Sequence, residues 1–348
     1  MYNLLDNISY DKLFSYCKGT FQEMIEAGIT SVGEFHYVHH SDILNKNFDL
    51  DKAVINAAKA TGIRLVLLVT LYTYAGLDRS VELSDKQKHF KSHVDEFLIY
   101  VKELKNKVVK EELVTIGIAA HSIRAVHEDD LDKLWQFCAN ENMPLHMHLE
   151  EQPQEIVDCQ KFLNKDPSEV LLEKFDKFGK VNLTGVHFSF TKPDLLRKLT
   201  NNGTNLCICP TTEGYLGDGI PTLSTNDSIV LGTDCNNRIC MIEEARLLAF
   251  GQNLKYNNRN NASLDANNLM DILTVNGARS LGLESKIGRF QENYDFDFVS
   301  IGVNNVVLSN FANSDELADA IIFSCDNREV VNVCVNGKIL FAKKIYSD

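Results

Sequence analysis

The stretch LHMHLEEQ (residues 145–152) contains two histidines one residue apart and a glutamate three residues after the second. Side chains two positions apart on a β-strand point to the same face, so His146 and His148 face the same space. Glu151 follows where such a strand would end. Catalytic zinc sites use imidazole and carboxylate ligands, so this stretch predicts a strand that carries part of a metal-hydrolase site.

Similar short apolar runs recur along the chain and alternate with helix-period segments such as DDLDKLWQFCANEN, which begins at Asp129. This alternation is typical of βαβ units around a parallel sheet. We predict seven strands: TSVGEFHY (30–37), IRLVLLVTLY (63–72), VTIGIAAHS (114–122), MPLHMHLEE (143–151), VNLTGVHFS (181–189), TNLCICPTT (204–212) and SIVLGTDCN (228–236).

Polar and ionisable residues gather where these predicted strands end, which is where a (β/α)8 barrel builds its active site. A single strand histidine is more often a hydrogen-bonded core residue than a ligand. The whole set of residues, and no single one of them, therefore indicates an active site. The residues are Glu34, His36, Tyr37, His39 and His40 after the first strand, His121 and Arg124 after the third, His146, His148 and Glu151 at the fourth, His187 at the fifth and Asp234 at the seventh.

The composition favours one large α/β domain, because the chain has 348 residues of which 44% are hydrophobic. A formal net charge of −13 argues against nucleic acid or an anionic membrane as the main partner, since both reward a basic surface. The longest apolar run is about half of what a bilayer span needs, and residues 1–30 lack a signal-peptide pattern. The nine cysteines are scattered and form no CxxC pair, which favours reduced thiols. We therefore expect a cytoplasmic protein that binds a small molecule.

The residue types at the strand ends suggest a divalent metal with a proton carrier beside it. Zn²⁺ or Fe²⁺ favours imidazole and carboxylate ligands, which makes His148, His187 and Asp234 the candidates. Glu151 is placed to move protons between water and a leaving nitrogen.

A cationic side chain accompanies these groups. Arg124 offers a planar fork that suits a substrate carboxylate, and His121 lies three residues before it and can add a hydrogen bond. A surface salt bridge is the alternative for Arg124 taken alone. Beside so many ionisable groups, substrate binding is the favoured interpretation.

Five segments together resemble the amidohydrolase superfamily, and within it the formimidoylglutamate deiminases of histidine degradation. They are VGEFHYVHH, AAHSIRAV, HMHLEEQPQEIVDC, CPTTEGYLGDGI and GTDCNNRICMIEEARLLAFGQNL, in order and with appropriate spacing. The resemblance implies hydrolysis of N-formimidoyl-L-glutamate to N-formyl-L-glutamate and ammonia. It implies one divalent metal, zinc or alternatively iron, in a distorted TIM-like (β/α)8 barrel capped by a small β-sandwich. Whether the protein forms a homodimer is left open.

The resemblance also implies roles for single residues. It makes the segment CPTTEGYLGDG a glycine-rich loop over the site. The implied metal ligands are His148 and Asp234, the implied proton-transfer pair is Glu151 and His187 with Asp234 as a further catalytic group, and the implied substrate contacts are Tyr37, His121 and Arg124.

The start of the chain departs from the superfamily pattern, in which β-sandwich strands precede a first barrel strand ending in His-x-His. Here residues 1–30 suit the first crossover helix and lead directly into what corresponds to strand two. We therefore expect an N-terminally truncated or split gene product, or a degenerate paralogue. On this interpretation residues 1–290 form an incomplete (β/α) barrel without strand one. Residues 291–348 form the C-terminal part of the β-sandwich, because short alternating strands begin near Phe296.

Two alternatives stay open at this point. His146 and His148 could replace the His-x-His pair and join His187 and Asp234, although the strand order of the resemblance makes His146 a supporting residue. The chain could also be another deaminase of the superfamily, or a catalytically inactive paralogue that acts as a binding partner of a full-length relative.

Overall fold

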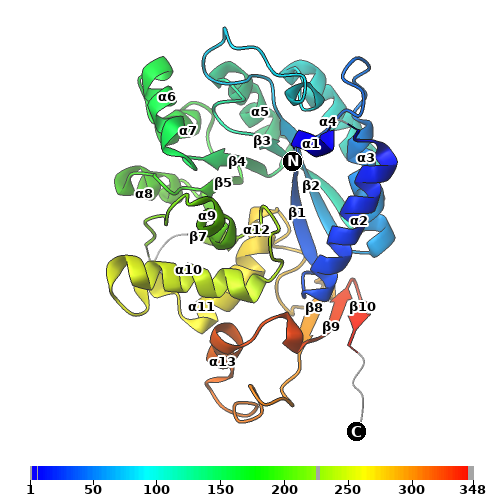
Figure 1. Ribbon diagram of the computed structural model, residues 1–348, viewed down its shortest axis with the longest axis vertical. Helices are drawn as coiled ribbons and strands as arrows, with labels where there is room; N and C mark the ends of the chain where they lie inside the picture. The colour runs from blue at the N-terminus through cyan, green and yellow to red at the C-terminus, as the bar shows by residue number, and fades with distance from the viewer. Residues whose placement is uncertain (1, 6, 225–227, 344–348) are drawn as a thin grey trace.

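A computed structural model describes residues 2–5, 7–224 and 228–343. Its largest element is a parallel sheet of seven strands, which follow one another in chain order and curl into half of a barrel wall (Figure 1). The prediction of seven parallel strands is confirmed. They are β1 (Ser31–His36), β2 (Arg64–Leu71), β3 (Val114–Ala120), β4 (Leu145–Leu149), β5 (Leu183–His187), β6 (Asn205–Ile208) and β7 (Ser228–Leu231).

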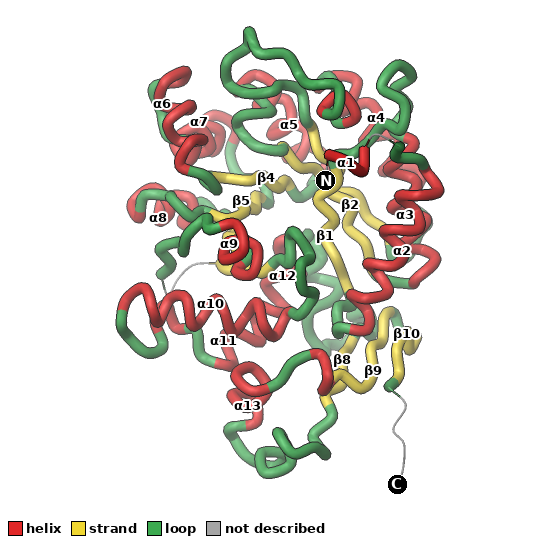
Figure 2. Tube along the Cα trace, viewed as in Figure 1, coloured by secondary structure: helices red, strands yellow, loops and turns green. Residues whose placement is uncertain are grey.

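Helices connect successive strands and surround the curled sheet (Figure 2). Within the described ranges, no helix is long and apolar enough to cross a membrane. The α-helices are α1 (Tyr2–Leu5), α2 (Tyr10–Glu26), α3 (Asp49–Thr61), α4 (Val94–Val108), α5 (Glu128–Glu141), α6 (Pro153–Leu163), α7 (Pro167–Phe178), α8 (Pro193–Asn201), α9 (Pro210–Leu216), α10 (Met241–Tyr256), α11 (Ala266–Asp271), α12 (Gly277–Ser280) and α13 (Leu317–Ser324). Shorter turns are the 3₁₀-helices Gln87–His89, Asn261–Ser263 and Asn327–Glu329 and the π-helical turn Ile272–Asn276.

The strand β2 is apolar on both faces because each face is covered. All eight residues of β2 are buried. Leu65 and Leu67 pack in the large core formed with the helices, whereas Val66 and Leu68 alternate with them and pack in a separate cluster with residues that follow α12. This alternation is the period of a strand. A buried parallel strand therefore reads as one continuous apolar run.

The segment CPTTEGYLGDG is not the loop that we predicted. Residues 210–216 form the helix α9, with Pro210 in its first turn and Gly217 in the left-handed conformation after its last residue (φ 78°). Gly214 lies inside this helix. Only Gly217 and Gly219 have the positive φ for which glycine is favoured. The physical reason is that proline is favoured in the first turn of a helix, where its missing N–H costs no hydrogen bond, so Pro210 begins α9 despite the glycines that follow.

The C-terminal residues form a separate antiparallel sheet of three strands, β8 (Phe298–Ile301), β9 (Val330–Val335) and β10 (Lys338–Ala342). This sheet lies at the amino end of β1, below α2 in Figure 1, and β9 and β10 contact α2. Arg64, at the start of β2, links the two sheets: its guanidinium lies 2.8 Å from Asp295 and 2.9 Å from Asp297. The predicted change to short strands after residue 296 is confirmed, with α13 inserted between β8 and β9.

Candidate functional site

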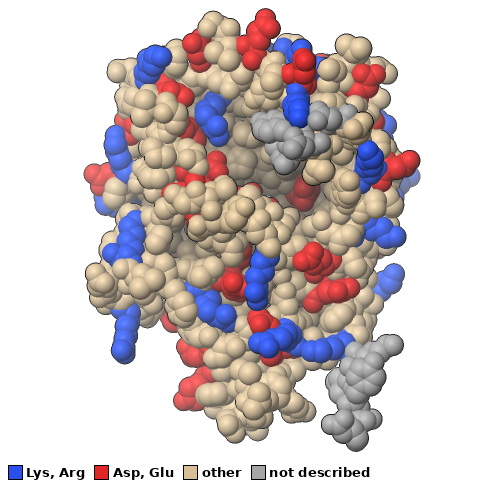
Figure 3. Space-filling model, viewed as in Figure 1, with Lys and Arg blue, Asp and Glu red and all other residues tan. Residues whose placement is uncertain are grey.

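The predicted site residues lie at the carboxyl ends of the parallel strands. In the space-filling view this face of the molecule is hollowed near its centre, where Figure 1 places the ends of β1, β4 and β5 (Figure 3). Acidic side chains are visible at the edge of the hollow. The arrangement agrees with the rule that parallel α/β sheets place their ligands beyond the carboxyl ends of the strands.

The ring of His148 has one nitrogen that carries a proton and one that carries a lone pair. Its Nδ1 lies 2.7 Å from the backbone oxygen of His121. A carbonyl oxygen can only accept, so Nδ1 carries the proton and Nε2 is left as an acceptor. Metal-ligating histidines usually donate their second N–H to such an oxygen. Burial holds the pKa of His148 well below its ordinary value, which favours the neutral form that a ligand needs.

His187 lies between two carboxylates. Its Nε2 is 3.8 Å from Oε1 of Glu151, and its Nδ1 is 3.3 Å from Oε1 of Glu213. The backbone of His187 has φ 85°, an uncommon conformation for a residue with a side chain. Burial of the ring lowers its pKa, but the hydrogen bond with Glu213 and the charge of Glu151 outweigh this and raise the pKa of His187 to about 9.

Glu151 and Asp234 are two further carboxylates close to the His187 ring. Burial raises the pKa of Glu151 although His187 acts in the opposite direction. Asp234 follows β7 with φ 44°, and its limited hydration raises its pKa, partly offset by His187 and a hydrogen bond with Thr212. Groups of this kind are candidates for proton transfer because their proton affinity moves towards neutral pH.

One set of potential metal ligands at these strand ends is compact. In the described part of the chain, ligand atoms of His187, Cys209 and Asp234 all lie within 4.8 Å of one another. His148 faces His187 with the ring centroids 5.5 Å apart. His148, His187 and Asp234 therefore come from three strands to one region, as predicted. Their donor types, including the unprotonated Nε2 of His148, suit a divalent metal.

The three predicted substrate contacts also lie together. The rings of Tyr37 and His121 are 5.1 Å apart, edge to face, and Nη2 of Arg124 is 4.0 Å from Oε2 of Glu151. Burial and the charge of Arg124 lower the pKa of His121 to about 3, so this ring is neutral. The Arg124 side chain is 37% exposed, so its guanidinium remains accessible beside Glu151.

His146 points away from this set. Its Nε2 donates to the backbone oxygen of Ser280 at 3.0 Å, and burial lowers the pKa of the ring to about 4. A nitrogen that is already hydrogen-bonded to a carbonyl has no lone pair for a metal. The contact ties Nε2 of His146 to Ser280 of α12 and leaves Nδ1 as the acceptor, an arrangement that agrees with a supporting role for this ring.

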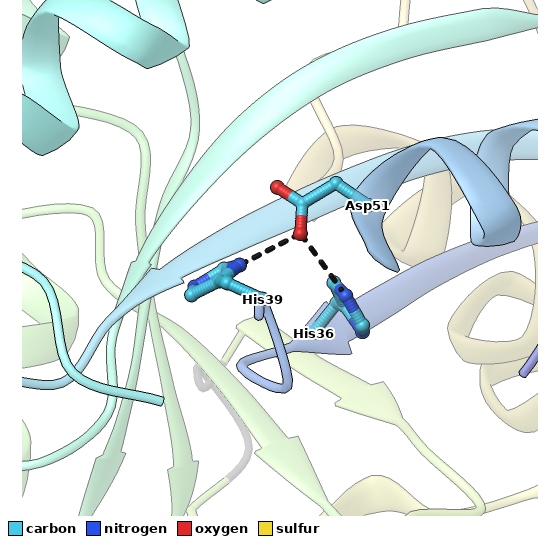
Figure 4. A group of neighbouring side chains, drawn as sticks. All are labelled: His36, His39 and Asp51. Carbon is cyan, nitrogen blue, oxygen red and sulfur yellow. Dashed lines mark hydrogen bonds and ion pairs between the residues drawn. The ribbon is translucent and has the colours of Figure 1, made fainter. Parts of the chain in front are cut away.

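His36, at the end of β1, and His39, just after it, form a second cluster with an acid from α3. His39 Nδ1 lies 2.8 Å and His36 Nε2 lies 3.2 Å from Oδ1 of Asp51, and the three side chains converge as Figure 4 shows. The other nitrogen of His39 is 2.8 Å from the backbone oxygen of Thr70. His39 and Asp51 are fully buried. Because both ring nitrogens of His39 face acceptors, the pair is best described as an imidazolium bound to a carboxylate.

The pKa values of this pair shift in opposite directions. Burial lowers the pKa of His39, but the charge and hydrogen bond of Asp51 outweigh it and raise the pKa above its ordinary value. Burial raises the pKa of Asp51, but His39 and His36 outweigh it and lower the pKa. Both shifts favour the charged pair. His36 and His39, which we grouped with the site at the strand ends, therefore serve the connection between β1, β2 and α3.

Comparison with known proteins agrees with this geometry. The sequence model described as "Amidohydrolase family" matches residues 2–340. The chain belongs to the amidohydrolase family. This amidohydrolase is similar to the formimidoylglutamate deiminase of Pseudomonas aeruginosa, with 28% identity over 97% of the chain and 76% of the relative. It is an enzyme that acts on carbon–nitrogen bonds.

Two solved structures are also similar. An amidohydrolase from Brucella melitensis has a TM-score of 0.87 at 27% identity, covering 97% of this chain and 76% of that one. An adenosine deaminase from Xanthomonas campestris, solved with bound zinc, has a TM-score of 0.80 at 20% identity and covers 97% of this chain and 71% of its own. At that identity the second similarity establishes the shared fold only.

Sequence reasoning missed two acids of this amidohydrolase. Glu213 escaped notice because its segment was expected to be a loop over the site, whereas α9 brings its carboxylate back to His187. Recognising Pro210 as a helix start would have placed Glu213 one turn above the end of β6. Asp51 lies in the first turn of α3, where an acid is normally assigned to the helix dipole. Nothing in the sequence pattern pairs it with His39.

Proposed function

We propose that this enzyme hydrolyses N-formimidoyl-L-glutamate to N-formyl-L-glutamate and ammonia. The observation that carries the proposal is the contact between an accessible guanidinium and a proton carrier: Arg124 lies 4.0 Å from Glu151, which lies 3.8 Å from His187. A substrate that joins a carboxylate to an amidine suits such a site. The similarity to a formimidoylglutamate deiminase supports the same substrate.

The carboxylate of the substrate would be bound by Arg124, with His121 and Tyr37 beside it. Arg124 is the only one of the three with a full charge, and a guanidinium matches a carboxylate with two parallel hydrogen bonds. The neutral ring of His121 can donate one further hydrogen bond. The edge-to-face contact between Tyr37 and His121 holds both rings in place.

A divalent metal would be held by His148 and Asp234, with zinc as the proposed ion. Zinc is present in the similar adenosine deaminase structure. When bound, such an ion lowers the pKa of a coordinated water to about 7 and acts as a Lewis acid. The lone pair of His148 Nε2 and the carboxylate of Asp234 are the donors that this chain offers for it.

The proton transfers would be made by Glu151 and His187. In the hydrolysis, water adds its oxygen to the amidine carbon, a C–O bond forms and the bond from that carbon to the terminal nitrogen breaks. Glu151 and His187 would move the two protons of the water, one before and one after the C–O bond forms, to the terminal nitrogen, which then leaves as ammonia. The raised pKa of Glu151 suits a group that must both accept and return a proton.

The direct test is ammonia release from N-formimidoyl-L-glutamate in the presence of added zinc. Adenosine is the comparison substrate, because an adenosine deaminase has the same fold. We expect ammonia from the formimidoyl compound and none from adenosine. Release from adenosine alone, or from neither compound by protein that contains stoichiometric zinc, would reject the proposed substrate.

Replacing Arg124 with methionine is expected to raise KM and to change kcat little. A hydrogen bond to a charged group contributes about 1.5–3 kcal/mol, which corresponds to an increase in KM of roughly 10–150-fold. Steady-state kinetics with N-formimidoyl-L-glutamate measure the effect. Arg197→Met is the matched control, because Arg197 is an exposed residue of α8 that pairs with Asp194 of the same helix. Equal KM values for the two variants would remove Arg124 from the substrate site.

A further inference from the structure

The ring of His187 is held from behind by an acid that lies on a different element. Glu213 is in α9, 26 residues further along the chain, and its Oε1 is 3.3 Å from Nδ1 of His187. The same oxygen accepts the backbone N–H of Cys209 at 2.9 Å. Both side chains are almost completely buried. The contact is therefore shielded from water. A hydrogen bond in the low-dielectric interior is stronger than one in water, so it holds the orientation of the ring more firmly.

The geometry points to Glu213 as the residue that positions His187 for catalysis. An oxygen that accepts the Cys209 amide acts as an acceptor, so Nδ1 of His187 is the donor and carries the proton. The ring cannot turn over without losing this bond. Its Nε2 is therefore directed to the opposite side, where Glu151 lies 3.8 Å away. Glu213 is therefore a positioning residue that acts through His187, and this inference rests on the role proposed above for His187.

Glu213 is itself fixed by the helix on which it lies. The first turn of α9 is anchored by Glu244 of α10, whose carboxylate accepts the backbone N–H of Thr211 at 3.0 Å and also contacts the Thr211 hydroxyl. Glu244 is fully buried. The far end of α9 closes with the N–H groups of Gly217 and Asp218 bonded to the Glu213 carbonyl. The support of His187 thus extends through Glu213 to α10.

A purely structural explanation competes with this one. Cys209 precedes the first residue of α9, so the bond from its N–H to Glu213 also stabilises the start of the helix. On that explanation the contact with His187 would be incidental. The two differ in what happens to the His187 ring when Glu213 changes.

The test compares Glu213→Gln with Glu213→Ala in the full chain. A glutamine oxygen can accept from both Cys209 and His187, whereas alanine removes the acceptor. We expect Glu213→Ala to lower kcat about 10–100-fold with little change in KM, the usual loss when a supporting partner is removed. Glu213→Gln is expected to retain most of the wild-type kcat. Glu23→Ala, on the exposed side of α2, is the control for a lost surface carboxylate.

A second readout does not depend on turnover. In protein labelled with ¹⁵N-histidine, the His187 signals, assigned by their loss in His187→Asn, should show a proton on Nδ1. This state should persist in Glu213→Gln and change in Glu213→Ala. An unprotonated Nδ1 in the wild type would overturn the proposal, as would an unchanged ring spectrum in Glu213→Ala. If N-formimidoyl-L-glutamate is not a substrate, the kinetic comparison is lost but the spectra still test the contact between Glu213 and His187. Failure of the proposed function can therefore be distinguished from failure of this inference.

Discussion

Replacing Glu151 with glutamine is expected to reduce kcat on N-formimidoyl-L-glutamate about 10²–10⁴-fold, the contribution of a well-placed proton carrier. The amide has nearly the same shape but cannot take a proton from water or return one to the leaving nitrogen. Because Glu151 is 4.0 Å from Arg124 and 3.8 Å from His187, the variant should keep the substrate contacts and leave KM within a few-fold of wild type.

The control is Glu173→Gln, the same substitution at a half-exposed residue of α7 that pairs with Lys165. It should not change kcat. Zinc content, measured by atomic emission, should be the same in wild type and both variants. A Glu151→Gln enzyme with wild-type kcat would exclude Glu151 as the proton carrier, and a variant that had lost its zinc would move Glu151 into the ligand set.

Replacing Asp51 with asparagine is expected to lower the free energy of unfolding by roughly 3–5 kcal/mol, the usual result of removing one partner from a buried ion pair. Asp51 and His39 are fully buried, and their atoms lie 2.8 Å apart. The variant leaves the imidazolium without its counter-charge. Chemical denaturation followed by circular dichroism measures the difference.

The stability difference should also depend on pH. The folded pKa of His39 is raised, so its contribution is complete below its unfolded pKa of about 6.5 and is lost as pH rises through the higher folded value. The folded pKa of Asp51 is lowered, so its contribution is complete above about pH 3.9 and is lost as pH falls towards the folded value. The wild type and Asp51→Asn should therefore differ most between about pH 4 and pH 6.5.

Asp49→Asn is the matched control, because Asp49 lies in the same turn of α3 and accepts hydrogen bonds from Ser41. The Ser41 hydroxyl is neutral, so we expect Asp49→Asn to lower the free energy of unfolding by only about 1 kcal/mol. This difference should not depend on the titration of a histidine. If the two variants were equally stable at pH 5, the buried pair would contribute no more than an ordinary hydrogen bond.

The sequence alone determined the strands and the end of the sheet at which the chemistry lies. Continuous apolar runs such as residues 63–72 are local signals, and the parallel arrangement then places all carboxyl ends at one edge. This is why His148, Glu151, His187 and Asp234 could be grouped although they are up to 86 residues apart. The sequence signal for the C-terminal sheet is also local, because the alternation of apolar and polar residues with period two is visible within each strand.

The tertiary structure alone decided which atoms face one another. The proton on His148 Nδ1 follows from its contact with the His121 carbonyl, and the orientation of His187 follows from Glu213. The pairing of His39 with Asp51 depends on where α3 packs against β1. A sequence pattern fixes the face of an element on which a residue lies. It does not fix the distance of a few ångströms between side chains of different elements, and hydrogen bonding and pKa depend on that distance.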